Sequence, residues 1–227
     1  MSSETYQGLV LFDFDGTLAD SAPDLAEAAN QQRRYRGLAD LPYEALRPVA
    51  SQGAPGLLRV ALGLEREHPD FEATRQQFLA DYAACMTERT DLFPGIPALL
   101  ENLESHGLGW GIVTNKVERL ALPIIDFLDL SRRSAATVCG DTCAHAKPHP
   151  EPVAHAIRLA GYRPEDTIYV GDDERDIIAG RDAGTRTIAV GFGYCEPSQA
   201  KRWGADAYVE HPEALWDTIL ALLPSRT

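Results

Sequence analysis

Cysteine is scarce in this chain of 227 residues, and its four cysteines do not form the dense pattern of a disulfide-stabilised domain. We therefore expect reduced thiols. Cys139 and Cys143 are followed by His145 and His149, and thiolate and imidazole are both zinc ligands. Their spacing matches no standard zinc pattern, so we expect ordinary turn residues here rather than a zinc site.

Positive charge is also in short supply. Lysine and arginine number 21 against 34 aspartates and glutamates, which gives a formal net charge of -13 at pH 7. A nucleic acid or an anionic membrane surface would be repelled by this chain, so neither is expected as a partner. An anionic substrate would need cationic groups close to where it binds.

Long hydrophobic runs are missing as well. The segment 1–8 has no basic stretch followed by an apolar run, so we expect neither a secretory signal nor a spanning helix, and a cytoplasmic location is the default. The hydrophobic fraction of 44% is ordinary for a globular enzyme. The length allows one domain or a core domain with a smaller insertion, and oligomeric state, monomer or dimer, is not readable.

Short apolar runs alternate with segments of helical length along most of the chain. This pattern predicts an α/β protein with a doubly wound, mainly parallel sheet, whose ligands bind at the carboxyl ends of the strands. The expected strands are 9–12, 110–113, 136–139, 167–170 and 187–190, and the expected helices are 97–106, 120–128, 152–160 and 176–183.

The stretch 21–90 interrupts the alternation and contains no convincing strand. We expect an all-helical cap here, inserted into a core made of 1–20 and 91–227. Its first helix should begin at Ser21, with Asp24 three residues later completing an approximate capping box. We expect a glycine-rich turn at 51–56 and a further helix over 71–86.

Asp13 and Asp15 end the first apolar run, and Gly16 and Thr17 follow them. Residues two apart on a strand point the same way, so the two carboxylates should converge. Two unit charges about 4 Å apart repel by roughly 4 kcal/mol at an effective dielectric of 20, so the pair needs a cation. A tight turn at Gly16 and Thr17 would bring backbone close to a ligand.

A second acidic group, Gly171 to Asp176, follows the expected strand 167–170. Read alone, acidic residues suit a helix amino terminus. Together with Asp13 and Asp15 they form a set of hard oxygen ligands without histidine or thiol, which favours Mg²⁺ over Zn²⁺. Thr114 ends another strand, and Lys147 lies in a proline-rich turn, where it could offset the carboxylates.

These segments, taken in order, resemble the four motifs of the haloacid dehalogenase superfamily, over essentially the whole chain. The chain is most similar to phosphoglycolate phosphatases and, more closely, to N-acetylmuramic acid 6-phosphate phosphatases. The segments that carry the resemblance are Asp13-Phe14-Asp15-Gly16-Thr17-Leu18, Val113-Thr114-Asn115, Lys147-Pro148 and Gly171 to Asp176, with support from Trp110 to Lys116 and from Gly180 to Thr187.

The resemblance implies a phosphatase that acts on a small phosphorylated metabolite. Asp13 would be the nucleophile and Asp15 the general acid and base. Thr114 and Lys147 would hold the phosphoryl oxygens. Mg²⁺ would be bound by Asp13, the backbone carbonyl of Asp15, and Asp172.

Other positions are less sharply assigned. Many relatives have a small residue where this chain has Asp173, so Asp173 and Asp176 stay open as further metal ligands, with Asp176 expected in the outer shell. The resemblance gives Gly16, Thr17 and Asn115 as phosphate-binding candidates, and the cap residues Arg47 and Ser51 as substrate contacts. A sugar phosphomutase and, from another class, a phospho-accepting signalling module remain alternatives.

Overall fold

The core of the protein is a six-stranded parallel sheet, shown by a computed structural model that describes residues 7–223. The strand order is β5-β4-β1-β6-β7-β8, and every neighbouring pair is parallel. The strands are β1 (Leu9–Phe12), β4 (Gly109–Val113), β5 (Thr137–Val138), β6 (Thr167–Gly171), β7 (Arg186–Val190) and β8 (Ala207–Val209).

The five strands expected from the sequence are all present, so the α/β fold with a mainly parallel sheet is confirmed. The central strands β1 and β6 are buried along their whole length, which explains why they read as unbroken apolar runs. No apolar run indicated β8, a three-residue edge strand that is only partly buried.

The order in which strands are added to the sheet reverses beside β1. From β1 the chain runs outward to β4 and β5, and then returns to the other side of β1 for β6, β7 and β8. Such a switch point leaves a crevice at the carboxyl ends of the strands, where ligands of doubly wound sheets bind. The fold therefore places the segments after β1, β4 and β6 next to one another.

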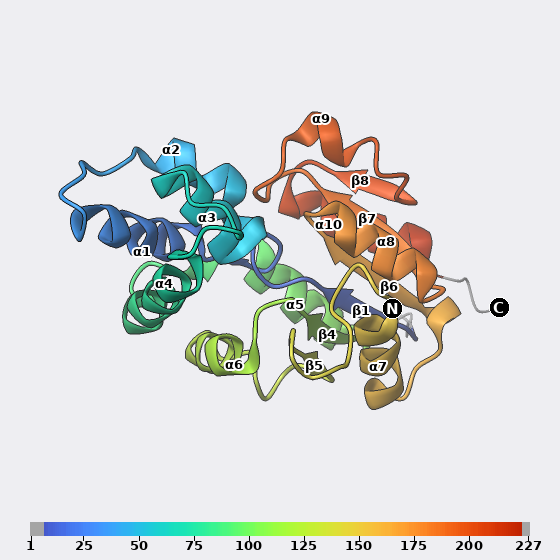
Figure 1. Ribbon diagram of the computed structural model, residues 1–227. Coiled ribbons are helices and arrows are strands. Elements are labelled where there is room, and N and C mark those ends of the chain that lie inside the picture. Colours follow the sequence, from blue (N-terminus) through green and yellow to red (C-terminus); the bar gives the residue numbers. More distant parts are fainter. Residues whose placement is uncertain (1–6, 224–227) are drawn as a thin grey trace. The chain divides into compact units, whose positions relative to one another are not determined.

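Helices cover the sheet on both faces, as parallel connections require. Figure 1 shows α7 (Glu151–Ala160) and α8 (Glu174–Asp182) on its near side, where Val153, Ala156, Ile157 and Ala179 join Leu9 and Leu11 in one hydrophobic cluster. The remaining core helices are α5 (Ile96–Ser105), α6 (Glu118–Phe127), α9 (Pro197–Ala200) and α10 (Leu215–Leu222), with 3₁₀ turns η2 (Pro164–Asp166) and η3 (Pro212–Ala214).

The chain divides into two compact units. We call the part up to Ala19 and from Leu92 onward the core unit, and Asp20–Asp91 the helical unit. The short strands β2 (Ala19–Asp20) and β3 (Asp91–Leu92) pair with each other where the chain passes between the two units. The role of the helical unit as a cap over the site stays a prediction.

The helical unit contains α1 (Ala22–Arg34), α2 (Tyr43–Leu46), η1 (Arg47–Gln52), α3 (Gly53–Leu62) and α4 (Phe71–Cys85). The helix expected over 71–86 is present, and Phe78 stacks on Tyr82 within it, with ring centroids 6.5 Å apart. Among residues 7–223, no helix is long and apolar enough to cross a membrane.

Two local predictions in the helical unit are wrong. α1 begins after Ser21 as expected, but the capping box is absent, because the Ser21 side chain makes no capping bond and the Asp24 carboxylate accepts from Arg89 and Thr90. The segment 51–56 is not an open turn but the junction of η1 and α3. The positive φ of 62° at Gly53 separates the two helices without unfolding the segment.

Candidate active site

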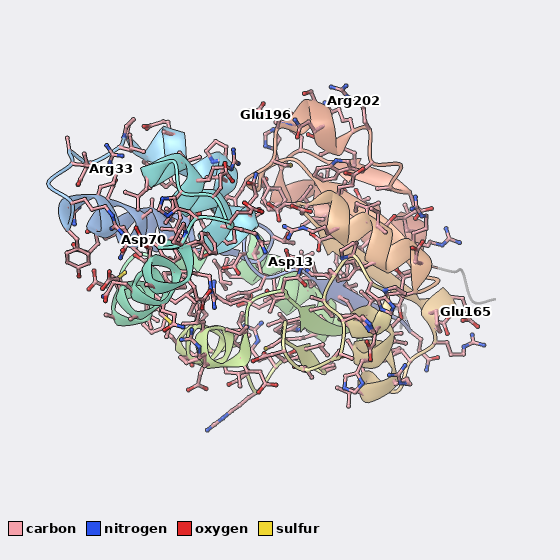
Figure 2. The ribbon with its side chains drawn as sticks, viewed as in Figure 1. Asp13, Arg33, Asp70, Glu165, Glu196 and Arg202 are labelled. Atoms are coloured by element: carbon pink, nitrogen blue, oxygen red, sulfur yellow. The ribbon has the colours of Figure 1, made fainter. Side chains whose placement is uncertain are left out.

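Asp13 directly follows β1 at the switch point (Figure 2). Its backbone N–H donates to the carbonyl of Val170 on β6 at 2.9 Å, which fixes where its side chain emerges. One carboxylate oxygen lies 2.8 Å from Lys147 Nζ. The carboxylate is only 13% exposed, so this pair is held away from bulk solvent.

Lys147 reaches the site from the loop between β5 and α7. Its ammonium group contacts Asp13, Asp176 at 2.7 Å, the carbonyl of Val113 at 2.9 Å and the hydroxyl of Tyr169 at 2.9 Å. Burial disfavours the charge of Lys147, but the two aspartates outweigh it and raise the pKa of Lys147 well above its ordinary value. Lys147 is therefore a fixed cation.

Asn115 fixes the backbone of Lys147. Its side-chain NH₂ donates to the Lys147 carbonyl and its side-chain oxygen accepts from the Lys147 N–H, both at 2.9 Å. These two bonds join the segment after β4 to the loop after β5. Both polar atoms of the Asn115 amide are thus engaged with Lys147, which favours a positioning role over direct contact with phosphate.

Three carboxylates converge beside Lys147. One oxygen each from Asp13, Asp172 and Asp176 lies within 4.8 Å of the others. Burial first, and then the charge of Asp176, raise the pKa of Asp13 to about 7. Burial followed by the charge of Asp13 raises the pKa of Asp172 well above its ordinary range. One lysine does not balance three carboxylates of which two are buried and the third is largely shielded, so the cluster suits a bound cation.

Asp172 is enclosed by backbone from two further segments. The Tyr194 N–H donates to Asp172 Oδ2 at 2.8 Å, and the Thr17 hydroxyl donates to Oδ1 at 3.4 Å. Gly16 has φ +88°, and a Cβ atom there would lie 2.3 Å from Asp172 Oδ2. Gly16 is therefore required both by its backbone conformation and by the close approach of the carboxylate.

The three aspartates that follow β6, which are Asp172, Asp173 and Asp176, have different surroundings. Asp173 caps α8 by accepting from the Arg175 N–H, and it is also paired with the Arg175 guanidinium at 2.7 Å. Arg175 outweighs burial and holds the pKa of Asp173 below its ordinary value. Asp176 accepts from the Asp173 N–H and from Lys147. Asp172 is consequently the best placed of the three to bind a cation directly.

Asp15 lies two residues beyond Asp13 and pairs with Lys116. Lys116 Nζ donates to Asp15 Oδ1 at 2.7 Å, and the side chains are 8% and 17% exposed. The Lys116 N–H also donates to the Thr114 hydroxyl at 3.1 Å, which orients that hydroxyl at the end of β4. Thr114 itself is buried, and its N–H continues the ladder to Val138.

Three residues of the site were missed from the sequence. Tyr169 is hidden in an apolar strand, yet its hydroxyl contacts Lys147. Tyr194 contributes a backbone N–H, which any residue but proline could supply. Lys116 could have been recognised from the sequence as a site residue, because it directly follows the candidates Thr114 and Asn115.

The remaining sequence candidates belong to other elements of the chain. Arg47 and Ser51 both belong to η1 of the helical unit, and their contact with substrate stays a prediction. Burial raises the pKa of the Cys139 thiol to about 12 and that of Cys143 as well. In the part of the chain that the structure describes, neither cysteine joins a group of potential metal ligands.

A buried aspartate at the switch point, a fixed lysine and a carboxylate cluster define a class: a doubly wound α/β enzyme equipped for chemistry on an anionic group. Residues 10–190 match the model of the haloacid dehalogenase-like hydrolase family. The chain belongs to this family.

Curated relatives extend the match. An N-acetylmuramic acid 6-phosphate phosphatase of Pseudomonas aeruginosa is 42% identical over 211 residues, covering 92% of this chain and 93% of the relative. A phosphoglycolate phosphatase of Xanthomonas campestris is 42% identical over 212 residues, covering 92% and 94%. These relatives and the family place the chain among the phosphoric monoester hydrolases.

A solved structure agrees with this placement. The crystal structure of a predicted phosphoglycolate phosphatase from Haemophilus somnus superposes with a TM-score of 0.81 at 25% identity, and the match covers 93% of this chain and 97% of that one. The similarity therefore extends over most of the chain and is not limited to the motifs.

Proposed function

We propose that this protein is a Mg²⁺-dependent phosphomonoesterase that hydrolyses a small phosphorylated metabolite through an aspartyl phosphate on Asp13. The observation that carries the proposal is the Asp13 carboxylate, which lies 2.8 Å from the fixed cation of Lys147 and within 4.8 Å of the ligand atoms of Asp172 and Asp176. A nucleophile, a phosphate-binding cation and a metal-binding group thereby occupy one place.

The donor set fits Mg²⁺. All three convergent groups are carboxylates, which are hard ligands, and no histidine or thiol among residues 7–223 belongs to this cluster. Asp13 and Asp172, with the Asp15 carbonyl, would hold the ion, while Asp176 would orient Lys147. When bound, Mg²⁺ would neutralise the repulsion between the carboxylates and a phosphate dianion.

Asp13 would attack the phosphorus atom, so that a bond forms to the Asp13 oxygen as the bond to the leaving alcohol breaks. Lys147 would hold a phosphoryl oxygen and keep Asp13 ionised. The Thr114 hydroxyl would take a second phosphoryl oxygen at the end of β4. Fixed donors of this kind stabilise charge where it develops in the transition state.

Asp15 would protonate the leaving alcohol in the first step. In the second step it would accept a proton from the water that attacks the aspartyl phosphate, which frees Asp13 and releases inorganic phosphate. Lys116, bound to Asp15 at 2.7 Å, would position its carboxyl group between these two steps. Lys116 is thus a positioning residue in this proposal.

For the substrate we propose N-acetylmuramic acid 6-phosphate or 2-phosphoglycolate. The relatives named for these two substrates are equally similar to this chain, at 42% identity each. A phosphomutase would use the same aspartyl phosphate but return the phosphoryl group to a sugar. A signalling module would release phosphate once for each protein molecule. Release of inorganic phosphate over many turnovers distinguishes hydrolysis from both alternatives.

The test is a comparison of steady-state rates on both substrates and on hexose phosphates, with Mg²⁺ and with chelator. We expect many turnovers with Mg²⁺, and a preference of about 100-fold for one substrate, which corresponds to about 2.7 kcal/mol in the transition state. Asp13→Asn should lose activity by about 10⁴-fold or more and keep its circular dichroism spectrum. Full activity in that variant or in chelator would disprove the mechanism.

A further inference from the structure

A second group of metal-type ligands lies outside the carboxylate cluster. His145, His149 and Glu151 form it, in the loop between β5 and the first residue of α7. One ring nitrogen from each histidine and one Glu151 oxygen all lie within 4.8 Å of one another. The proposed phosphatase chemistry uses none of these three side chains.

The three side chains already contact one another. His145 Nδ1 lies 2.8 Å from Glu151 Oε2, and the His145 N–H donates to the same oxygen at 3.1 Å. The Glu151 N–H donates to His149 Nδ1 at 3.1 Å. The two imidazole rings stack with centroids 4.3 Å apart and planes inclined by 22°. Little rearrangement is needed to bring three donors onto one ion.

We propose that His145, His149 and Glu151 form a binding site for a transition-metal dication of the Zn²⁺ type. Imidazole nitrogen with one carboxylate suits Zn²⁺, Ni²⁺ or Co²⁺ and not Mg²⁺, which prefers oxygen throughout. The spacing of the two histidines, with three residues between them, lies within the range used by zinc sites. The ion takes the place of the proton between His145 and Glu151, and water completes its coordination.

The position of the site gives it a consequence for Lys147. His145 and His149 flank Lys147 at equal distance along the chain, and Asn115 holds the Lys147 backbone from the other side. An ion that joins the two histidines closes the loop across Lys147 and stabilises the native loop by mass action. The His145 side chain is 61% exposed, so ions from solution can reach it.

The test is calorimetric titration of Zn²⁺ into untagged, chelator-treated protein in excess Mg²⁺, which occupies the carboxylate cluster. We expect one equivalent of Zn²⁺ to bind. His145→Gln and His149→Gln should each weaken binding by about tenfold or more, since even groups that only support a metal ligand contribute about 10–100-fold. Co²⁺ should bind to the same site and give a visible absorption band that these variants lose.

His68→Gln is the matched control. His68 is exposed, and its Nδ1 accepts from the Asp70 N–H at 3.1 Å, as His149 accepts from Glu151. Among residues 7–223, His68 belongs to no group of three ligands. Wild-type affinity in this variant supports the proposal. Equal weakening in His68→Gln, unchanged binding in both loop variants, or loss of Zn²⁺ binding in Asp13→Asn would overturn it.

Discussion

Asp24 in the helical unit and Asp172 in the core unit are both fully buried, but their charges are handled in opposite ways. Asp24 Oδ2 accepts from the Arg89 N–H, the Thr90 N–H and the Thr90 hydroxyl at 3.1, 2.9 and 2.8 Å. Its other oxygen lies 3.4 Å from the Arg89 guanidinium. Asp24 thus ties the last residues of the helical unit to its first helix.

Asp172 instead lies close to the carboxylates of Asp13 and Asp176, and Lys147 pairs with those two. The contrast shows that burial of an acidic side chain does not by itself mark a functional site. What marks it is a charge that the protein's own groups leave uncompensated. Asp24 is compensated by hydrogen bonds and an ion pair within its own unit, whereas Asp172 lies in a cluster of three carboxylates that suits a bound cation.

The largest effect that tests this contrast is expected from Asp172→Asn. The amide oxygen can still accept from the Tyr194 N–H, but the negative charge is lost, so we expect kcat/KM with Mg²⁺ to fall by about 10²–10³-fold. In chelator the same variant should melt at the wild-type temperature or above it, because a repulsive charge has been removed. Steady-state rates and thermal melts measure the two effects.

The contrast would fail if Asp172→Asn melted well below wild type in chelator. That outcome would mean that Asp172, like Asp24, is needed for folding. Glu165→Gln is a suitable control for the loss of one negative charge, because Glu165 is a 63% exposed residue of η2 in the same unit and should change neither quantity.

Asp24→Asn should lower stability and leave activity near wild type, which is the reverse of the result expected for Asp172→Asn. Its amide NH₂ would face the Arg89 and Thr90 donors, so one buried acceptor is lost and a donor is left unsatisfied. We expect the free energy of unfolding to fall by about 1–3 kcal/mol, measured by urea denaturation. Rates taken well below the melting temperature should stay near wild type. A large loss of kcat in fully folded protein would instead assign Asp24 to the site.

Strand positions were predictable from the sequence because β1 and β6 are buried on both faces and read as continuous apolar runs. The edge strand β8 was not, since three residues with partial exposure carry no such pattern. The start of α1 at Ser21 was predicted correctly, but its capping box was not, because a capping box is a local rule. The Asp24 carboxylate instead accepts a hydrogen bond from Thr90, which lies 66 residues away in the sequence.

The site was predictable as far as its residues follow strands. Asp13, Thr114 and Asp172 each come after a core strand, and the topology brings those strand ends together. Sequence alone could not divide the roles of the acidic residues after β6, because Arg175 and the capping of α8 decide them through side-chain geometry. The contact of Lys116 with Asp15 joins segments 101 residues apart and was equally hidden.

The smallest expected effect is a difference in how folding stability depends on pH. The pKa of Asp13 is raised from 3.8 to about 7 by burial and Asp176, and that of Asp172 is raised as well. A carboxyl group with a raised pKa binds more protons in the native state than in the unfolded state. Stability therefore falls as pH rises from about 4 to about 7.

Unfolding free energies in chelator between pH 5 and pH 8 measure this fall. The unfolding free energy of Asp172→Asn should fall less over this pH range than that of wild type, because one of the groups with a raised pKa is gone. We expect a difference on the order of 1 kcal/mol. Saturating Mg²⁺ should flatten the wild-type curve by binding the ionised carboxylates. If wild type and Asp172→Asn had the same slope in chelator, the carboxylates of the core unit would be as well compensated as Asp24, and the contrast between the two units would not hold.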